Sequence, residues 1–374
     1  IAAGAALNIT TASVHSLDGR TLNNAGTATF GGTGGLSLQN QAVFNNQAAG
    51  VFIMQTDADI SGGTFNNAGT WRKTAGAETQ LLGVFNHTGT FEVQTGPVTL
   101  NGGGVGTSAF NVNNAATLTF GNYTLNTGAA LNGAGTYLLP NLGTLSIAGN
   151  VACNATFTHN GGTLGGGGTF TANTVYNWQG GTMSGNGVTV IPAAAMLNIT
   201  VNAGKTLDTR TLNNAGTTLM NDTGSLGLTN NAVINNQLGA LFEIQTAAGI
   251  AQGGAPSAVV FNNQGSVRKT ATGDSIITVP FNNANQIEIT AGSLTFGQFT
   301  QTAGSTVLNG GGLGFTLAGQ LQGGTLSGAD AHSNIARRHA GSGAMGGRRP
   351  ATRRCRHQRA QVGLPAFERL ARVP

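Results

Sequence analysis

The sequence predicts an all-β protein whose body is a parallel β-helix (β-solenoid), followed by a tail of different composition. Three observations support this: glycine is abundant, charge is scarce, and one short pattern recurs about every 21 residues. Glycine makes up 61 of 374 residues and charged residues make up 8%, whereas average chains carry about 7% glycine and about 25% charge. Glycine at this density opposes helices. No run of about 18 apolar residues exists, which excludes a membrane-spanning helix.

Two long internal copies occupy the body, about 7–190 and 197–328. Residues 17–27 recur as residues 207–217, with Leu-Asp-x-Arg-Thr-Leu-Asn-Asn-Ala-Gly-Thr in both. Later matches imply about 20 additional residues near 101–119 of the first copy. The comparison therefore predicts that one whole repeat unit was gained or lost there.

A shorter period lies inside each copy and is marked by asparagine. These motifs are about 20 to 22 residues apart, except for one longer step that holds an insertion. At about 4.8 Å a coil, residues 1–328 predict roughly 15 coils and a rod near 75 Å long. Leucine-rich repeats have a similar period but need an L-x-x-L-x-L core, which is not visible here. The motifs begin at Asn23, Asn45, Asn66, Asn86, Asn213, Asn235, Asn262 and Asn282.

The strands are predicted from alternation with period two. Apolar residues alternate with Glu92 and Glu288, so we expect the glutamates to face solvent. The Asn-Asn-x-Gly-Thr motif is interpreted as the turn, because Asn and Gly tolerate positive φ. Stacked coils would bring the asparagine amides into hydrogen-bonded ladders. The predicted inward residues are Leu36, Leu38, Phe52, Met54, Phe91, Val93, Leu226 and Leu228.

These turns, the Gly-Gly-Thr-Leu-Ser-Gly step at 323–328 and the low charge resemble a group of bacterial surface repeats. The body is similar to the repetitive regions of filamentous haemagglutinin-like and autotransporter-type proteins. The resemblance covers residues 1–328. It implies a secreted or surface-exposed rod that is associated with the outer membrane and used for adhesion or as a stalk. The chain begins at Ile1 within a repeat, so we expect a fragment of a longer protein.

The net charge of +5 comes from the tail. Residues 1–328 carry seven basic and ten acidic side chains, so nucleic acid is not expected to bind the body. Residues 329–374 carry ten arginines and no lysine. One hypothesis is a frameshift near residue 329, because a shifted frame allows the threonine-rich strand that the repeat predicts. The tail would then be non-native or disordered. The alternative is a genuine basic arm that binds nucleic acid or lipid head groups.

Few residues in the body suggest chemistry. Asp57 and Asp59 form a close acidic pair, which a catalytic or calcium site would use, but a solvated turn is the simpler interpretation. Asp18 with Arg20, and Asp208 with Arg210, are expected to form surface ion pairs.

Two basic pairs also recur, Arg72-Lys73 and Arg268-Lys269. We expect solvated positions on a turn or strand edge, with an anion or glycan contact as the alternative.

The remaining reactive side chains are isolated. His15, His87 and His159 lack metal-ligand spacing. Cys153 is expected to be a buried small residue rather than the disulfide partner of Cys355. The two tryptophans, Trp71 and Trp178, are expected within strands, although sugar stacking is an alternative.

The sequence thus predicts a non-enzymatic structural or adhesive segment with no catalytic residues, cofactor or metal. Partners would be glycans or proteins on host or neighbouring cells, and the location would be extracellular, at the bacterial cell surface. Two alternatives remain. A carbohydrate-active β-helix enzyme, a lyase or hydrolase, requires a carboxylate cluster on one face. An ice-binding solenoid requires regular threonine rows.

Overall fold

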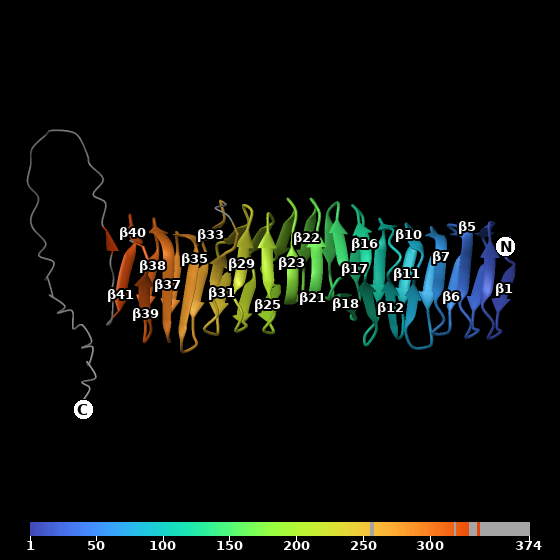
Figure 1. Ribbon diagram of the computed structural model, residues 1–374, viewed down its shortest axis with the longest axis horizontal. Coiled ribbons are helices and arrows are strands. Elements are labelled where there is room, and N and C mark those ends of the chain that lie inside the picture. Colours follow the sequence, from blue (N-terminus) through green and yellow to red (C-terminus); the bar gives the residue numbers. More distant parts are fainter. Residues whose placement is uncertain (255–257, 318, 329–334, 337–374) are drawn as a thin grey trace, which may run out of the picture. The chain divides into compact units, whose positions relative to one another are not determined.

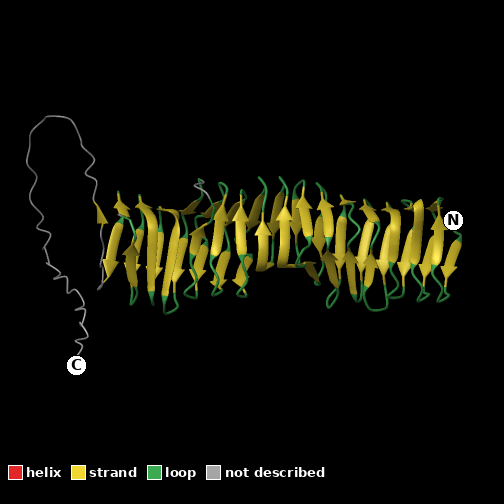
Figure 2. Cartoon of the chain, viewed as in Figure 1, coloured by secondary structure: helices red, strands yellow, loops and turns green. Residues whose placement is uncertain are grey.

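The computed structural model describes residues 1–254, 258–317, 319–328 and 335–336. Its strands form a parallel β-solenoid of about 16 turns, which confirms the predicted fold class. The described residues contain no helix, and residues 1–338 form one compact unit (Figures 1 and 2). Apart from 335–336, the tail predicted to be non-native or disordered lies outside the described residues.

Each turn contributes strands to three parallel columns, which we name faces 1, 2 and 3 after β1, β2 and β3. Face 1 comprises β1 (Ala6–Ile9), β4 (Thr27–Phe30), β6 (Val51–Met54), β8 (Thr70–Lys73), β11 (Thr90–Val93), β14 (Ala109–Val112), β17 (Ala130–Asn132), β20 (Val151–Cys153), β22 (Thr169–Ala172), β24 (Val188–Ile191), β27 (Thr211–Asn214), β30 (Val233–Asn236), β33 (Val260–Asn263), β40 (Gly319–Leu321) and β42 (Ile335–Ala336).

Face 2 comprises β2 (His15–Asp18), β9 (Thr79–Leu81), β12 (Pro97–Leu100), β15 (Thr117–Phe120), β18 (Thr136–Leu139), β25 (Met196–Thr200), β28 (Thr217–Asn221), β31 (Leu241–Ile244), β34 (Ser266–Lys269), β36 (Gln286–Ile289), β38 (Ser305–Leu308) and β41 (Thr325–Gly328). Face 3 comprises β3 (Thr21–Asn24), β10 (Val84–His87), β13 (Val105–Gly106), β16 (Asn122–Leu125), β19 (Thr144–Ile147), β26 (Lys205–Asp208), β29 (Leu226–Thr229), β32 (Ile250–Gln252) and β39 (Gly312–Phe315).

Six long strands bend round a corner and belong to two faces. Four run from face 2 to face 3: β5 (Leu36–Asn46), β7 (Ile60–Asn67), β21 (Thr156–Gly165) and β23 (Val175–Met183). Two run from face 3 to face 1: β35 (Asp274–Asn283) and β37 (Ser293–Gln301).

The interior is filled as period two predicts. All eight residues predicted to point inward are buried, which confirms their orientation. Aromatic rings stack between turns, with Phe44 on Phe65 at 4.7 Å and Trp71 on Phe91 at 4.6 Å between ring centroids. Both predicted tryptophan positions are confirmed, since Trp71 lies in β8 and Trp178 in β23, each fully buried. A fully buried indole is not available for stacking on a sugar.

The two sequence copies lie on different faces of the solenoid. The Leu-Asn-Asn motif ends β3 on face 3 in the first copy and β27 on face 1 in the second. Face 3 continues from β3 through nine turns to β26, and β27 is the next strand. Equivalent strands of the two copies are therefore separated by nine complete turns and one further strand, which moves the motif from face 3 to face 1. Matched surface features point in different directions around the axis.

The additional residues of the first copy form one complete turn. Strands β13, β14 and β15 pair with the turns on both sides and so extend all three faces by one strand. A unit of this kind can be gained or lost because each turn contacts only its neighbours.

The asparagine pairs are strand ends and not turns, which corrects the turn prediction. Asn23 and Asn24 are the last two residues of β3, and the turn is the Ala25-Gly26 step after them. Glycine is needed at this step because a side chain would clash with the preceding turn, and not because the backbone has a positive φ. A Cβ on Gly69, for example, would lie 2.2 Å from a backbone oxygen of the preceding turn. Positive φ occurs at a different corner, at Asn40 and Gln41 in the first copy.

Candidate functional site

Asparagine side chains form an inner ladder at one corner of each copy, which confirms the predicted amide ladders. The Nδ2 group of Asn24 donates to Oδ1 of Asn46, and that of Asn46 donates to Oδ1 of Asn67, both at 2.8 Å. Each amide also donates to a backbone carbonyl of the next turn, as Asn46 does to Thr70 at 2.9 Å. These amides are buried, so the ladder satisfies polar groups that would otherwise destabilise the corner.

A second, outer ladder runs beside the inner one with the opposite direction of donation. Asn45 Nδ2 donates back to Asn23 Oδ1 at 2.8 Å, and Asn66 donates back to Asn45 at 2.8 Å. Because the inner amides donate forward and the outer amides donate backward, the dipoles of the two rows oppose each other.

The second copy repeats both ladders on face 1. Its inner row is Asn214, Asn236, Asn263 and Asn283, joined by hydrogen bonds of 2.8 Å and continued at 3.0 Å to Gln301. Its outer row is Asn213, Asn235, Asn262 and Asn282, joined at 2.9 to 3.0 Å.

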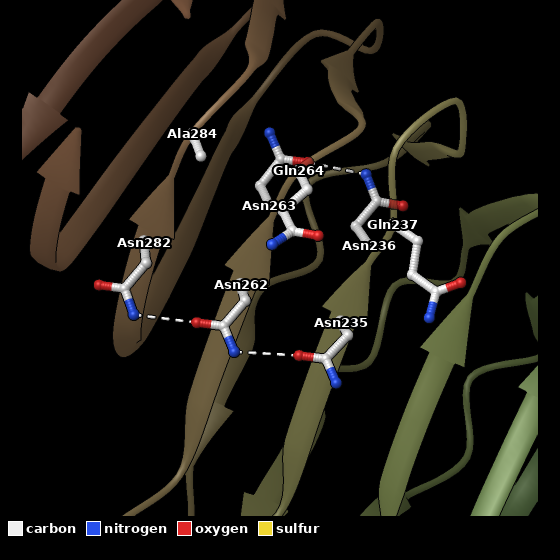
Figure 3. A pocket seen from close by; sticks show the side chains of 8 residues that line it. All are labelled: Asn235, Asn236, Gln237, Asn262, Asn263, Gln264, Asn282 and Ala284. Carbon is white, nitrogen blue, oxygen red and sulfur yellow. Dashed lines mark hydrogen bonds between the residues drawn. The ribbon is translucent and has the colours of Figure 1, made fainter. Parts of the chain in front are cut away.

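A surface groove of about 370 Å³ follows the ladders of the second copy. Figure 3 shows the outer amides in one row, with the inner amides and two glutamines beside them. No lining residue is charged. The groove is lined by Asn235, Asn236, Gln237, Asn262, Asn263, Gln264, Asn282 and Ala284.

Each outer amide keeps unused hydrogen-bonding capacity. A primary amide has two N–H donors and two acceptor lone pairs, and Asn262 uses one of each within the ladder. The side chains of Gln237 and Gln264 make no hydrogen bond in the described part of the chain. The groove therefore presents donors and acceptors side by side, repeated from turn to turn.

Arg210 does not lie on the surface, and the predicted ion pair with Asp208 is wrong. Its guanidinium is fully buried and donates to Thr189 Oγ1 and to four backbone carbonyls of earlier turns. Burial lowers its pKa to about 10. Asp208 instead accepts a bond from Asn230 one turn later at 2.7 Å, as Asp18 does from Asn40 at 2.6 Å. Arg20, in the first described turn, makes no ion pair with Asp18.

The lysines of the two basic pairs are also buried, contrary to the solvated positions predicted for them. Lys73 Nζ donates to the carbonyls of Thr56 and Ala75 and to Thr79 Oγ1, at 2.7 to 3.0 Å. Lys269 Nζ donates to the Ala271 carbonyl at 2.5 Å. Burial lowers the pKa of both lysines, because it removes the water that would solvate the ammonium. These side chains hold corners of the solenoid and do not offer a charge to a ligand.

Their arginine neighbours remain at the surface, where they pair with glutamates of adjacent turns. Arg72 Nε lies 2.5 Å from Glu92. Arg268 lies between Glu243 at 3.7 Å and Glu288 at 3.5 Å. The glutamates face outward as predicted. The arginines compensate much of the negative charge of these glutamates.

The carboxylates of Asp57 and Asp59 accept hydrogen bonds from two different parts of the chain. Asp59 Oδ1 accepts from the backbone N–H of Gln80 at 2.8 Å, and Asp57 accepts from Thr56 Oγ1 at 3.2 Å. Asp59 therefore bonds to the next turn, whereas Asp57 bonds to its own neighbour in the sequence. Within the described ranges, no cluster of three or more His, Cys, Asp or Glu side chains is arranged to hold a metal ion.

Lys205 and Asp222 form a buried ion pair that the sequence did not predict. The two side chains are 1% exposed and in direct contact. Lys205 also donates to two backbone carbonyls, and Asp222 accepts from the Gly224 N–H at 3.0 Å. The available signal was the period-two position of Lys205, because Asp222 follows by 17 residues, four fewer than the 21-residue turn that pairs Lys205 with Leu226.

Two of the isolated histidines are buried groups with polar partners. His87 occupies an inner-ladder position, bonded by Asn67 at 3.1 Å and to the Ala109 carbonyl at 3.0 Å. His159 lies 3.1 Å from the Tyr176 hydroxyl. Burial lowers the pKa of each imidazole to about 4.

Cys153 is buried and free, as predicted, and burial raises its thiol pKa to about 12. Cys355, the disulfide partner in the alternative interpretation, lies outside the described residues.

Comparisons with protein-family models, curated proteins and solved structures find no match to this chain. In the described part of the chain, no helix has the length and apolar character needed to cross a membrane.

Proposed function

We propose that this chain is a non-enzymatic structural and adhesive segment of a secreted, surface-exposed bacterial repeat protein. The observation that carries the proposal is the contrast between its interior and its surface. The apolar core is continuous along the stack, whereas the outer rows of amides are uncharged and recur on successive turns within each ladder.

Adhesion through such a surface would depend on the regular spacing of its polar groups. Neighbouring turns are about 4.8 Å apart, so a solenoid repeats the same polar group many times along a stiff support. Each contact is weak by itself, but a partner with a matching repeat can form many at once, which multiplies the effective affinity. Arg72 and Arg268 pair with three of the few surface carboxylates, and the low charge of the body favours partners recognised by hydrogen bonding.

The test is surface labelling of intact source cells with antibodies raised against the full chain. The proposal predicts labelling without permeabilisation, and loss of the label after brief protease treatment of intact cells. Labelling only after permeabilisation would overturn the surface location. A parallel incubation of the purified chain with polysaccharides, followed by detection of new reducing ends or unsaturated products, tests the non-enzymatic role, because any turnover would refute it.

A further inference from the structure

We propose that the amide groove of the second copy binds an uncharged, linear oligosaccharide. The groove comprises the eight residues from Asn235 to Ala284 that line the cavity of about 370 Å³. The inference rests on the proposed adhesive function and adds to it a site and a ligand class.

The chemistry of the lining selects hydroxyl groups. A sugar hydroxyl both donates and accepts, and so does a primary amide. Seven of the eight lining residues are amides, and none is charged. An anionic sugar would meet no cation in the groove, because no lining residue is basic.

The arrangement along the rod selects a linear chain. The outer amides of Asn235, Asn262 and Asn282 follow one another on adjacent turns, each bonded to the next (Figure 3). The remaining donors and acceptors therefore recur at the spacing of neighbouring strands, about 4.8 Å, which is close to the length of one sugar ring.

An extended peptide fits this surface less well than a sugar. Peptides that add to a sheet need free backbone donors and acceptors at its edge. Here β30 and β33 are paired with each other, and β33 is paired with the second half of β35. What the groove offers is side-chain amide groups.

The first copy provides a control within the same molecule. It has one glutamine at the matching corner, Gln47, but Ala68 stands where the second copy has Gln264. Both copies have the outer ladder, but only the second has a pair of glutamines beside it. Neither Gln237 nor Gln264 contributes a side-chain hydrogen bond to the fold, which makes both replaceable without weakening a ladder.

The experiment titrates the full chain with four neutral hexasaccharides, cellohexaose, maltohexaose, mannohexaose and chitohexaose, and with hexagalacturonate as the anionic counterpart. Binding is followed by calorimetry and by the side-chain amide signals in ¹⁵N–¹H spectra. We expect at least one neutral sugar to bind and to shift the signals of Gln237 and Gln264. The double variant Q237A/Q264A should bind it at least about tenfold more weakly, while Gln47→Ala should bind it like the parent.

The inference is overturned if no neutral hexasaccharide binds, if hexagalacturonate binds more tightly, or if Q237A/Q264A binds like the parent. These outcomes are independent of surface labelling. A chain that is exposed on cells but binds none of these sugars refutes the groove inference alone. Sugar binding by a chain found only inside cells refutes the surface proposal alone.

Discussion

The histidine in the inner ladder should make the solenoid sensitive to acid, and His87→Asn should reduce that sensitivity. His87 is fully buried, and its Nδ1 atom is hydrogen-bonded to the Nδ2 group of Asn67 in the inner ladder. The equivalent residue of the second copy is Asn283, which continues the row with an amide. The substitution therefore replaces the titrating member of the ladder with the residue that the protein itself uses elsewhere.

The size of the effect follows from the pKa. Burial lowers the pKa of His87 from 6.5 to about 4, and the hydrogen bond to the Ala109 carbonyl opposes this shift only in part. Between these values the unfolded chain binds a proton that the folded chain does not. The free energy of unfolding therefore falls as the pH drops from 6.5 to 4, and the difference in pKa corresponds to about 3 kcal/mol. His159, whose pKa is also about 4, adds a similar dependence.

The assay is urea unfolding of the parent and His87→Asn at pH 7 and pH 4. Asparagine is smaller than histidine and leaves space beside Phe110, whose ring centroid lies 4.6 Å from that of His87. That packing cost is the same at both pH values, so it cancels when the change with pH is compared. We expect the variant to lose about 3 kcal/mol less stability than the parent on acidification.

The reverse substitution, Asn283→His, should add acid sensitivity to the second copy, and His159→Asn should reduce it independently of His87. Equal losses of stability by the parent and His87→Asn between pH 7 and pH 4 would refute the reasoning, since they would show that the buried imidazole does not control the acid response.

Three further predictions concern groups inside the solenoid. Asp222→Ala leaves the ammonium of Lys205 buried without its partner and should cost about 3 to 5 kcal/mol of unfolding free energy in urea titrations. Asn236→Ala breaks the inner ladder and leaves buried amides unpaired, so it should cost about 1 to 3 kcal/mol, more than Asn235→Ala in the half-exposed outer row. Gly69→Ala places a Cβ 2.2 Å from a backbone oxygen of the preceding turn, so limited proteolysis should detect local opening there.

Each of these predictions has a matched control. Replacing Lys205 by Met together with Asp222→Leu removes both charges and should restore most of the lost stability. Gly167→Ala adds a Cβ with nothing within 4 Å and should leave the proteolysis pattern unchanged. Equal destabilisation by Asn235→Ala and Asn236→Ala would contradict the distinction between outer and inner ladders.

The fold class and much of the core could be predicted from the amino-acid sequence alone. Period-two alternation places residues such as Phe52 and Phe91 inward regardless of the coil to which they belong, because a strand has only two sides. The 20-to-22-residue recurrence identifies stacked turns for a similar reason, since the same short unit must cover its neighbour. The amide ladders followed from this stacking.

The face that each unit occupies and the positions of the buried charges depend on the three-dimensional path of the chain. The repeat in the sequence gives a separation in residues, whereas the face of a strand depends on how many strands precede it. Because turn lengths vary, the 190 residues between the two copies span nine turns and one further strand. The burial of Arg210 and Lys73 could not be predicted from the sequence for a related reason. Their partners are backbone carbonyls, which every residue possesses and no motif marks. Only the path of the chain shows which carbonyls converge to replace water around a buried charge.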